Sequence, residues 1–314
     1  MKEKILSASR IKTLETCSWS YWASYHLKIP QKGNDGSKRG TLCHLIFELL
    51  LNSRHKKHYE LIMKEGSTKS DLAIIKLITK HLNREQINTE ENFEMVCNMI
   101  YTGLNNDFFC EKSKLEDPEK EFLLENEEPK YKIKGFMDKL AFYKKKTFLK
   151  IIDYKSSKAK FKGEEIESNV QAMAYSLAAR KLWPNLKKVV VDFVFLRFPK
   201  DPIQSAPESS EEQLKGFERY LAYLYKIINN FTEKTAKSNY AAENQKNRWL
   251  CKAGKTWRCP YLDPVDFFVL LDKEGEAIDS SFKNDLKCPD GFKIEKRSYK
   301  GCPAHAISTD DFLD

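Results

Sequence analysis

Asp153 and Lys155 have the types and the spacing to bind a divalent cation and to assist chemistry beside it. They follow the apolar run in KTFLKIIDYKSS, residues 146–157, which is typical of a buried strand. Residues i and i+2 of a strand point to the same face, so the two side chains are expected side by side at one sheet edge. Charged groups there must be paired, metal-bound or solvated, because burying a lone charge is costly.

The preceding predicted strand supplies a second carboxylate. The segment IKGFMDKLAF places Asp138 in the neighbouring strand of the same hairpin, and two such carboxylates can converge on one hard divalent cation. The cation would polarise a phosphate and lower the pKa of a bound water, while Lys155 orients that water or offsets developing charge. Similar triplets occur at residues 128–130 and 285–287, but only the one at Asp153 follows a buried-looking strand. The alternative is a turn aspartate beside a solvated strand end.

Two helical segments carry further polar residues at i and i+4, on one helix face. His44 and Glu48 lie in the apolar segment LCHLIFELLL, where a polar ring needs a partner. Gln171 and Tyr175 lie on the helix that follows Asp153, so they could reach the same strand end. The alternatives are a core histidine bonded to a backbone carbonyl and an exposed or interfacial helix face.

The elements that must position these residues are helices towards both ends and strands in the middle. A helix is predicted over residues 7–27, with Ser7 and Ser9 as N-caps, and another over 41–63, with Leu45, Ile46, Leu49 and Leu50 on its buried face. Alternating residues predict strands, and 3.6-residue periodicity predicts further helices. The strands are 120–126, 131–143, 147–155 and 187–198. The further helices are two stretches up to about Phe109, one at 164–183 that is stopped by Pro184, and one within 210–239. From residue 246 the chain is cysteine-bearing and irregular, with a hairpin-like segment at FFVLLDKEGEAI.

Composition excludes several classes of protein. With 314 residues and 41% hydrophobic residues, the chain can form one large domain or one domain with an appendage. Its apolar runs are too short to span a membrane and its N-terminus lacks a secretory segment, so a soluble cytoplasmic protein is expected. The net charge of +9 is compatible with a polyanionic partner but is common among soluble proteins. Lys158, Lys160 and Lys162 either line a phosphate track or belong to a solvated loop.

The order of these motifs resembles the RecB-like branch of the PD-(D/E)XK nuclease superfamily. It comprises a helical histidine, Gly-x-x-Asp, Asp-x-Lys at a strand end and Gln-x-x-x-Tyr on the next helix, preceded by a cysteine-bearing helix, SASRIKTLETC. The resemblance implies a restriction-endonuclease-like α/β core with a short mixed sheet flanked by helices. It implies a single nuclease domain, 1–314, with an N-terminal helical lobe (1–118), the core (119–240) and a C-terminal Cys-rich segment (241–314) packed back on the N-terminus.

The resemblance also implies roles for the candidate residues. The ligands of a catalytic Mg²⁺ or Mn²⁺ would be His44, Asp138, Asp153 and the Tyr154 carbonyl. Lys155 would be the catalytic lysine, and Gln171 and Tyr175 would contact DNA or hold the lysine and its water. Glu48 has no counterpart in these motifs.

The cysteines suggest a second cofactor. In the iron-sulfur members of this family, one N-terminal and three C-terminal cysteines bind a [4Fe-4S] cluster, and the set implied here is Cys17, Cys251, Cys259 and Cys302. The C-terminal intervals of 8, 29 and 14 residues are longer than the family's, so residues 269–288 are interpreted as an insertion with Cys288 spare. The alternatives are a structural zinc site built from the C-terminal cysteines with His305, and unligated thiols. Cys43, Cys97 and Cys110 are expected to be buried hydrophobes.

Together these features predict a metal-dependent deoxyribonuclease. The resemblance implies an exonuclease on single-stranded DNA or DNA ends, in recombination, repair or DNA processing, with recombination or replication proteins as partners. The chain contains no helicase motor and resembles stand-alone phage or CRISPR-adaptation nucleases, which would place it in a host cytoplasm if phage-encoded. The alternatives are a catalytically inactive DNA-binding module of nuclease fold and a zinc-stabilised nucleic-acid adaptor.

Overall fold

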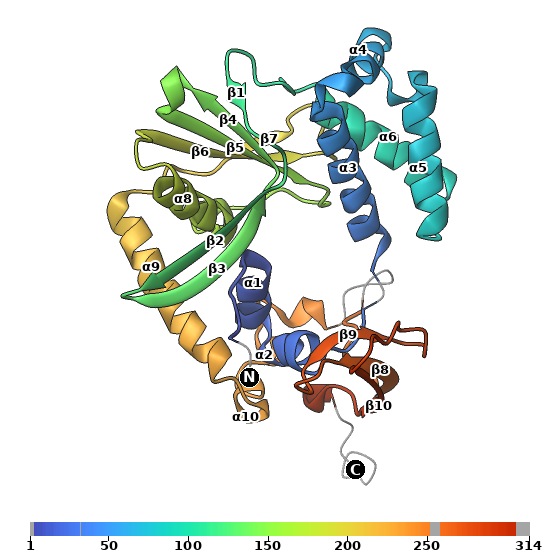
Figure 1. The fold of residues 1–314 in the computed structure, drawn as a ribbon, viewed down its shortest axis with the longest axis vertical. Helices are drawn as coiled ribbons and strands as arrows, with labels where there is room; N and C mark the ends of the chain where they lie inside the picture. The colour runs from blue at the N-terminus through green and yellow to red at the C-terminus, as the bar shows by residue number, and fades with distance from the viewer. Residues whose placement is uncertain (1–2, 32, 252–257, 306–314) are drawn as a thin grey trace. The chain divides into compact units, whose positions relative to one another are not determined.

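The chain forms two compact units in the computed structural model, which describes residues 3–31, 33–251 and 258–305 (Figure 1). The larger unit comprises residues 33–221, and the smaller one comprises residues 1–32 together with 222–314. These units divide the chain at different positions from the lobes 1–118, 119–240 and 241–314, because the first 32 residues group with the C-terminal part. Within the described residues, no helix is both long and apolar enough to cross a membrane.

A five-stranded mixed sheet forms the centre of the larger unit, in the order β1-β4-β5-β6-β7 (Figure 1). Its strands are β1 (Lys114–Leu115), β4 (Lys139–Tyr143), β5 (Phe148–Lys155), β6 (Lys188–Phe195) and β7 (Ile203–Ser205). β5 and β6 pair in parallel, whereas the other neighbours are antiparallel. β2 (Lys120–Glu127) and β3 (Lys130–Met137) form a separate antiparallel ribbon. The mixed α/β fold with a short mixed sheet and helices, expected from the family resemblance, is therefore confirmed.

The strand predicted over residues 131–143 is two strands, interrupted at Asp138. Residues up to Met137 pair with β2, and residues from Lys139 onward pair with β5. The chain changes partner at this point, so Asp138 belongs to neither ladder. Since Lys139 is opposite Ile152, Asp138 lies next to the end of β5 that carries Asp153.

The helices between residues 33 and 230 are α3 (Asp35–Leu51), α4 (Lys56–Glu65), α5 (Leu72–Arg84), α6 (Glu90–Leu104), α7 (Glu164–Glu167), α8 (Val170–Leu182) and α9 (Glu211–Asn229). α8 packs against β6, and α4 and α5 pack against α3 and α6. The helix predicted over 41–63 was wrong at both ends, because Asn34 caps an earlier start and the chain leaves the helix at Asn52. α3 buries Leu42, Cys43, Ile46, Phe47 and Leu50, whereas Leu45 is 39% exposed. The predicted buried face is therefore confirmed at Ile46 and Leu50 and was wrong at Leu45, while Leu49 is partly buried against the core.

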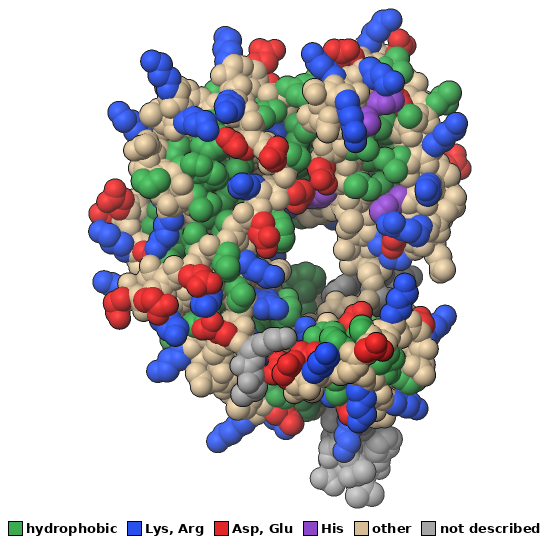
Figure 2. Space-filling model, viewed as in Figure 1, with side chains coloured by type: hydrophobic (Ala, Val, Ile, Leu, Met, Phe, Trp, Pro, Cys, Tyr) green, Lys and Arg blue, Asp and Glu red, His purple; other side chains and the backbone are tan. Residues whose placement is uncertain are grey.

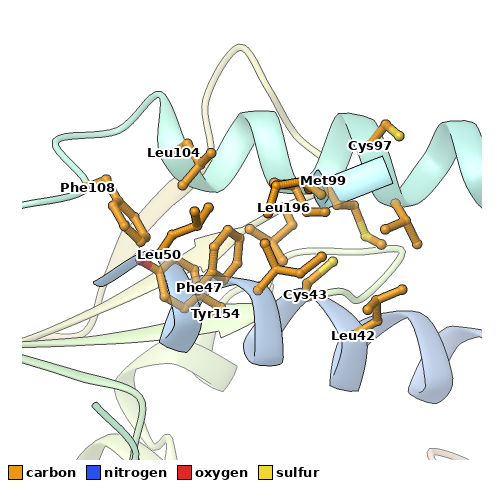
Figure 3. Close-up of a cluster of buried hydrophobic side chains, with 14 of the residues drawn as sticks. Leu42, Cys43, Phe47, Leu50, Cys97, Met99, Leu104, Phe108, Tyr154 and Leu196 are labelled. Atoms are coloured by element: carbon orange, nitrogen blue, oxygen red, sulfur yellow. The ribbon is translucent and has the colours of Figure 1, made fainter. Parts of the chain in front are cut away.

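The main core lies between α3, α6 and one face of the sheet (Figure 3). Ile152 and Tyr154 of β5 point into this core, and the Phe47 ring lies 4.3 Å from the Tyr154 ring. Asp153 points to the opposite face, as strand alternation requires. A carboxylate can therefore end a strand whose neighbours are buried hydrophobes.

Gly103 on α6 allows this close packing. A Cβ at Gly103 would overlap the Phe47 ring and crowd Leu196, whereas a Cβ at Gly216 on α9 meets no atom within 4 Å. We expect Gly103→Ala to lower the free energy of unfolding by about 1–3 kcal/mol through overpacking. The control Gly216→Ala should raise it by up to about 1 kcal/mol, because alanine is the better helix former. Urea unfolding measures both, and an unchanged midpoint for Gly103→Ala would contradict this packing.

The smaller unit contains short helices and a three-stranded antiparallel sheet in the order β10-β8-β9. Its elements are α1 (Ala8–Thr16), α2 (Ser18–Tyr21), a π-helical turn (Trp22–His26), α10 (Glu233–Ala236), β8 (Val265–Leu271), β9 (Ala277–Ser281) and β10 (Lys293–Tyr299). Ser7 accepts a hydrogen bond from the Arg10 amide, which confirms the predicted N-cap. The single helix predicted over 7–27 is broken at Cys17, whose backbone is extended (φ −160°, ψ 108°) and whose Sγ caps α2. The hairpin predicted near residue 270 is confirmed as β8 and β9.

Candidate active site

Asp153 lies at the carboxyl end of β5 and is 2% exposed. Its Oδ1 accepts a hydrogen bond from Gln171 Nε2 at 2.7 Å and lies 2.9 Å from the Tyr175 hydroxyl. Its Oδ2 forms an ion pair with Lys155 Nζ at 2.6 Å, but no described residue gives that oxygen a well-directed hydrogen bond. One oxygen of the carboxylate is thus fixed by α8, while the other retains a lone pair that a cation could use.

Helix α8 places Gln171 and Tyr175 against this strand end. The Asn169 side chain caps the helix by accepting from the Ala172 amide, which sets where the i and i+4 face begins. Gln171 Oε1 accepts from Lys155 Nζ at 2.7 Å, so the amide bridges the lysine and the aspartate. The Tyr175 hydroxyl also lies 2.6 Å from the Phe136 carbonyl, and its single proton can serve only one acceptor at a time.

Asp138 links this strand end to α3. Its Oδ2 accepts a hydrogen bond from the Tyr154 amide at 2.7 Å and lies 3.4 Å from His44 Nδ1. His44 Nε2 lies 3.2 Å from the Tyr154 carbonyl oxygen. The structure therefore brings together all seven residues proposed from the sequence for the active site: His44, Asp138, Asp153, Tyr154, Lys155, Gln171 and Tyr175.

Glu119 is a site residue that the sequence analysis missed. Its carboxylate lies 3.4 Å from His44 Nδ1, and its amide donates to the Asp138 carbonyl at 3.1 Å. One ligand atom each from His44, Glu119 and Asp138 lie within 4.8 Å of one another, a spacing at which they could hold a metal ion. No periodicity or motif marks Glu119, since it lies in the connection before β2, and only the fold brings it to His44.

A small cavity adjoins these ligands, lined by His44, Phe47, Glu48, Leu51, Pro118, Glu119, Asp138 and Tyr154. It leaves about 10 Å³ for the centre of a water-sized group, which matches roughly one water or one small cation. Oxygen and imidazole donors suit Mg²⁺ or Mn²⁺. The donor set of His44, Glu119 and Asp138 and the adjoining cavity therefore fit a hard divalent cation.

The electrostatics of the site show an excess of negative charge. Burial alone would lower the pKa of His44, but hydrogen bonds to Asp138 and Glu119 outweigh it and raise the pKa to about 10. Burial, and then the charge of Asp138, raise the pKa of Asp153 to about 6, although Lys155 opposes this. Both shifts have the direction expected where clustered carboxylates attract a positive charge. A bound cation would supply that charge and favour neutral His44 and ionised Asp153.

The fold and this site define a mixed α/β protein whose carboxylates and lysine meet at one sheet edge. The chain belongs to the PD-(D/E)XK nuclease superfamily, whose family model matches residues 5–263. A solved structure named "Putative exonuclease" from Eubacterium rectale is similar at 12% identity, covering 76% of this chain and 89% of that one, with a TM-score of 0.45. No curated protein matches. The family confirms the restriction-endonuclease-like fold and the class of hydrolytic nuclease.

Metal binding can be tested at Glu119. We expect Glu119→Gln to weaken Mn²⁺ binding by about tenfold or more, because it removes a charged ligand. Isothermal titration calorimetry measures the affinity. The matched control is Glu121→Gln, which makes the same change on the exposed face of β2, two residues away. Equal affinities for the two variants would show that Glu119 does not bind the metal.

Proposed function

We propose that the protein is a metal-dependent deoxyribonuclease, an exonuclease that acts on single-stranded DNA or DNA ends. The observation that carries the proposal is the network at the end of β5, in which Gln171 joins Lys155 to Asp153 while Asp138 and His44 face the same strand end. A structural ion pair between Asp153 and Lys155 would need no neighbouring set of cation ligands such as His44, Glu119 and Asp138. Membership of a nuclease superfamily supports the same reading.

Each residue has a separate task in this proposal. His44, Asp138, Asp153 and Glu119 would hold Mg²⁺ or Mn²⁺, which when bound polarises the phosphate and acidifies a water. The Tyr154 carbonyl is also a candidate ligand, although His44 Nε2 contacts it here. Lys155 is the catalytic residue that orients the attacking water or offsets phosphate charge. Gln171 and Tyr175 are positioning residues, because they touch Lys155 and Asp153.

The alternative is a DNA-binding module of the same fold without catalysis. We expect wild-type protein to cut end-labelled single-stranded or double-stranded DNA in Mg²⁺ or Mn²⁺. Asp153→Asn and Lys155→Ala should each reduce the rate by about 100-fold or more, because they remove groups that act at the reacting phosphate. The position of the label reports the direction of cleavage.

The chain offers a matched control for this experiment. Asp285 and Lys287 form the same Asp-x-Lys spacing on an exposed segment, so Asp285→Asn and Lys287→Ala should leave cleavage unchanged. Binding without cutting in either metal would favour the non-catalytic module. Compartment and partners stay predictions: the cytoplasm, or a host cytoplasm if phage-encoded, and recombination or replication proteins.

We further propose that Cys17, Cys251, Cys259 and Cys302 bind a [4Fe-4S] cluster. All four lie in the smaller unit, around a small core formed by Ala241, Ala242 and Leu262. The Cys302 amide donates to the Leu262 carbonyl at 3.1 Å, which joins two of the cysteine-bearing segments. Cys288 is exposed and its thiol bonds to the Phe292 carbonyl, in keeping with a spare cysteine. This arrangement supports the ligand set inferred from the family resemblance.

The distance between sulfur atoms is expected to differ between the cluster and its zinc alternative. Zinc bonds of about 2.3 Å in a tetrahedron hold sulfur atoms about 3.8 Å apart, whereas each thiolate of a [4Fe-4S] cluster binds a different iron and the sulfurs lie further apart. Among the described residues, these cysteines form no group of three with ligand atoms within 4.8 Å. The zinc alternative has one feature in its favour, since His305 Nε2 is buried without a hydrogen-bond partner among the described residues. We also propose that the protein is of the stand-alone nuclease type found in phages or in CRISPR adaptation.

Metal analysis of anaerobically purified protein distinguishes the two cofactors. We expect about four irons per chain and absorbance near about 400 nm, both lost in Cys17→Ala and Cys259→Ala, because each removes one cluster thiolate. Cys288→Ala should retain both signals. Stoichiometric zinc in a colourless protein would support the zinc site. If the protein contains neither iron nor zinc, the thiols are unligated.

A further inference from the structure

An open pocket lies beyond the carboxyl end of β6 and has no role in the site described so far. Its volume is about 490 Å³, and it is lined by Lys160, Arg197, Phe198, Pro199, Lys200 and Asp201. Three of these six residues are cationic and one is acidic. Lys160 was ambiguous in sequence, whereas Arg197 and Lys200 carried no signal there.

The pocket lies next to the carboxyl ends of β5 and β6, where the candidate active site is also found. β5 and β6 are parallel with Lys155 opposite Phe195, so the chain leaves both strands at the same edge. The Leu196 amide donates to the Lys155 carbonyl at 2.9 Å, and Arg197 is the next residue. If a DNA strand lay with one phosphate at Lys155, its neighbouring phosphates would therefore lie close to this pocket.

The two segments that form the pocket are fixed to each other. The Phe161 amide donates to Gln204 Oε1 at 3.2 Å, and Gln204 Nε2 donates to the Phe161 carbonyl at 3.1 Å. The Phe161 ring also packs edge-on against Phe193 and Phe195, with centroids 4.9 and 5.4 Å apart. A concave surface held in this way loses little conformational freedom when a ligand binds.

The charges in the pocket are only partly compensated. Asp201 accepts a hydrogen bond from Lys160 Nζ at 2.7 Å, and that ammonium lies 5.7 Å from the centre of the Phe198 ring. Among the described residues, neither Arg197 nor Lys200 has an acidic partner. Figure 2 shows Lys and Arg interspersed with Asp and Glu over the visible face, so the net charge of +9 forms no single basic patch there. Arg197 and Lys200 therefore leave two uncompensated positive charges in the pocket.

We propose that this pocket binds the sugar-phosphate backbone of the DNA strand next to the phosphate being cleaved. Arg197 and Lys200 contact its phosphates, and Phe198 and Pro199 form an apolar wall for a sugar or base. A solvated loop would explain the lysines, but it would not explain a rigid concave pocket at this edge. The inference rests on the proposed nuclease function and extends it to the path of the substrate.

The test measures binding separately from cleavage. Fluorescence anisotropy with a labelled 15-nucleotide single-stranded DNA, in EDTA to prevent cutting, gives the Kd between 50 and 200 mM salt. Each phosphate contact contributes about 0.7 to the slope of log K against log salt for single strands. We expect Arg197→Ala/Lys200→Ala to reduce the slope by about 1.4 and to raise Kd roughly tenfold or more at 50 mM salt.

Two further variants make the test specific. Lys76→Ala/Lys80→Ala removes the same charge from the exposed side of α5 and should have little effect. Asp201→Asn should tighten binding and raise the slope, because it frees Lys160 and removes repulsion from phosphate. Asp201 is 83% exposed, so this substitution leaves the core intact.

The outcomes separate this inference from the proposed function. If wild-type protein binds and cuts DNA but the Arg197/Lys200 variant keeps its Kd and slope, the pocket proposal fails and the nuclease proposal stands. The pocket proposal would also fail if the α5 control lost as much DNA affinity as the Arg197/Lys200 variant. It would fail likewise if the Arg197/Lys200 substitutions weakened binding of RNA of the same length more than binding of DNA. If the wild type neither binds nor cuts any DNA, both proposals fail.

Discussion

The parallel pairing of β5 with β6 is the constraint on which the site depends. Two parallel strands require a crossover connection, and here the crossover contains α8. The helix must pack back against the sheet, so Gln171 and Tyr175 arrive beside Asp153 rather than at the surface. The same pairing makes both strands end at one edge, which brings the segment after β6 next to Lys155. Active-site geometry and the neighbouring pocket thus follow from one element of topology.

The break between β3 and β4 at Asp138 is the second feature that shapes the site. Because the chain exchanges β2 for β5 as its partner there, Asp138 is released from ladder pairing and can accept the Tyr154 amide with its side chain. Tyr154 itself is anchored on the other face, where Phe47 packs against its ring. The hydrophobic core therefore fixes the backbone whose amide and carbonyl hold Asp138 and His44. Packing of the Tyr154 side chain thus determines where its backbone holds these two charged groups.

The fold also places cysteines that are far apart in the sequence in one compact unit. Cys17 is 234 residues before Cys251, yet the N-terminal segment and the C-terminal part belong to one compact unit. The break between α1 and α2 turns Cys17 out of a continuous helix and places its sulfur at the start of α2. Burial raises the pKa of Cys259 and Cys302 to about 11, so these thiols hold their protons unless a metal ion replaces them.

The sequence by itself determined the strands and the helix that carry the candidate site, and the order of the chemical groups. Apolar alternation identified β5 and β6, helical spacing placed Gln171 beside Tyr175, and the ordered motifs indicated the superfamily, because each of these signals is local. Only the tertiary structure decided the break at Asp138, the inward face of α3, the arrival of Glu119 beside His44 and the pocket at Arg197. Those features depend on which distant segments pair and which faces they bury. Such choices are made by long-range packing, which leaves no fixed spacing in the sequence.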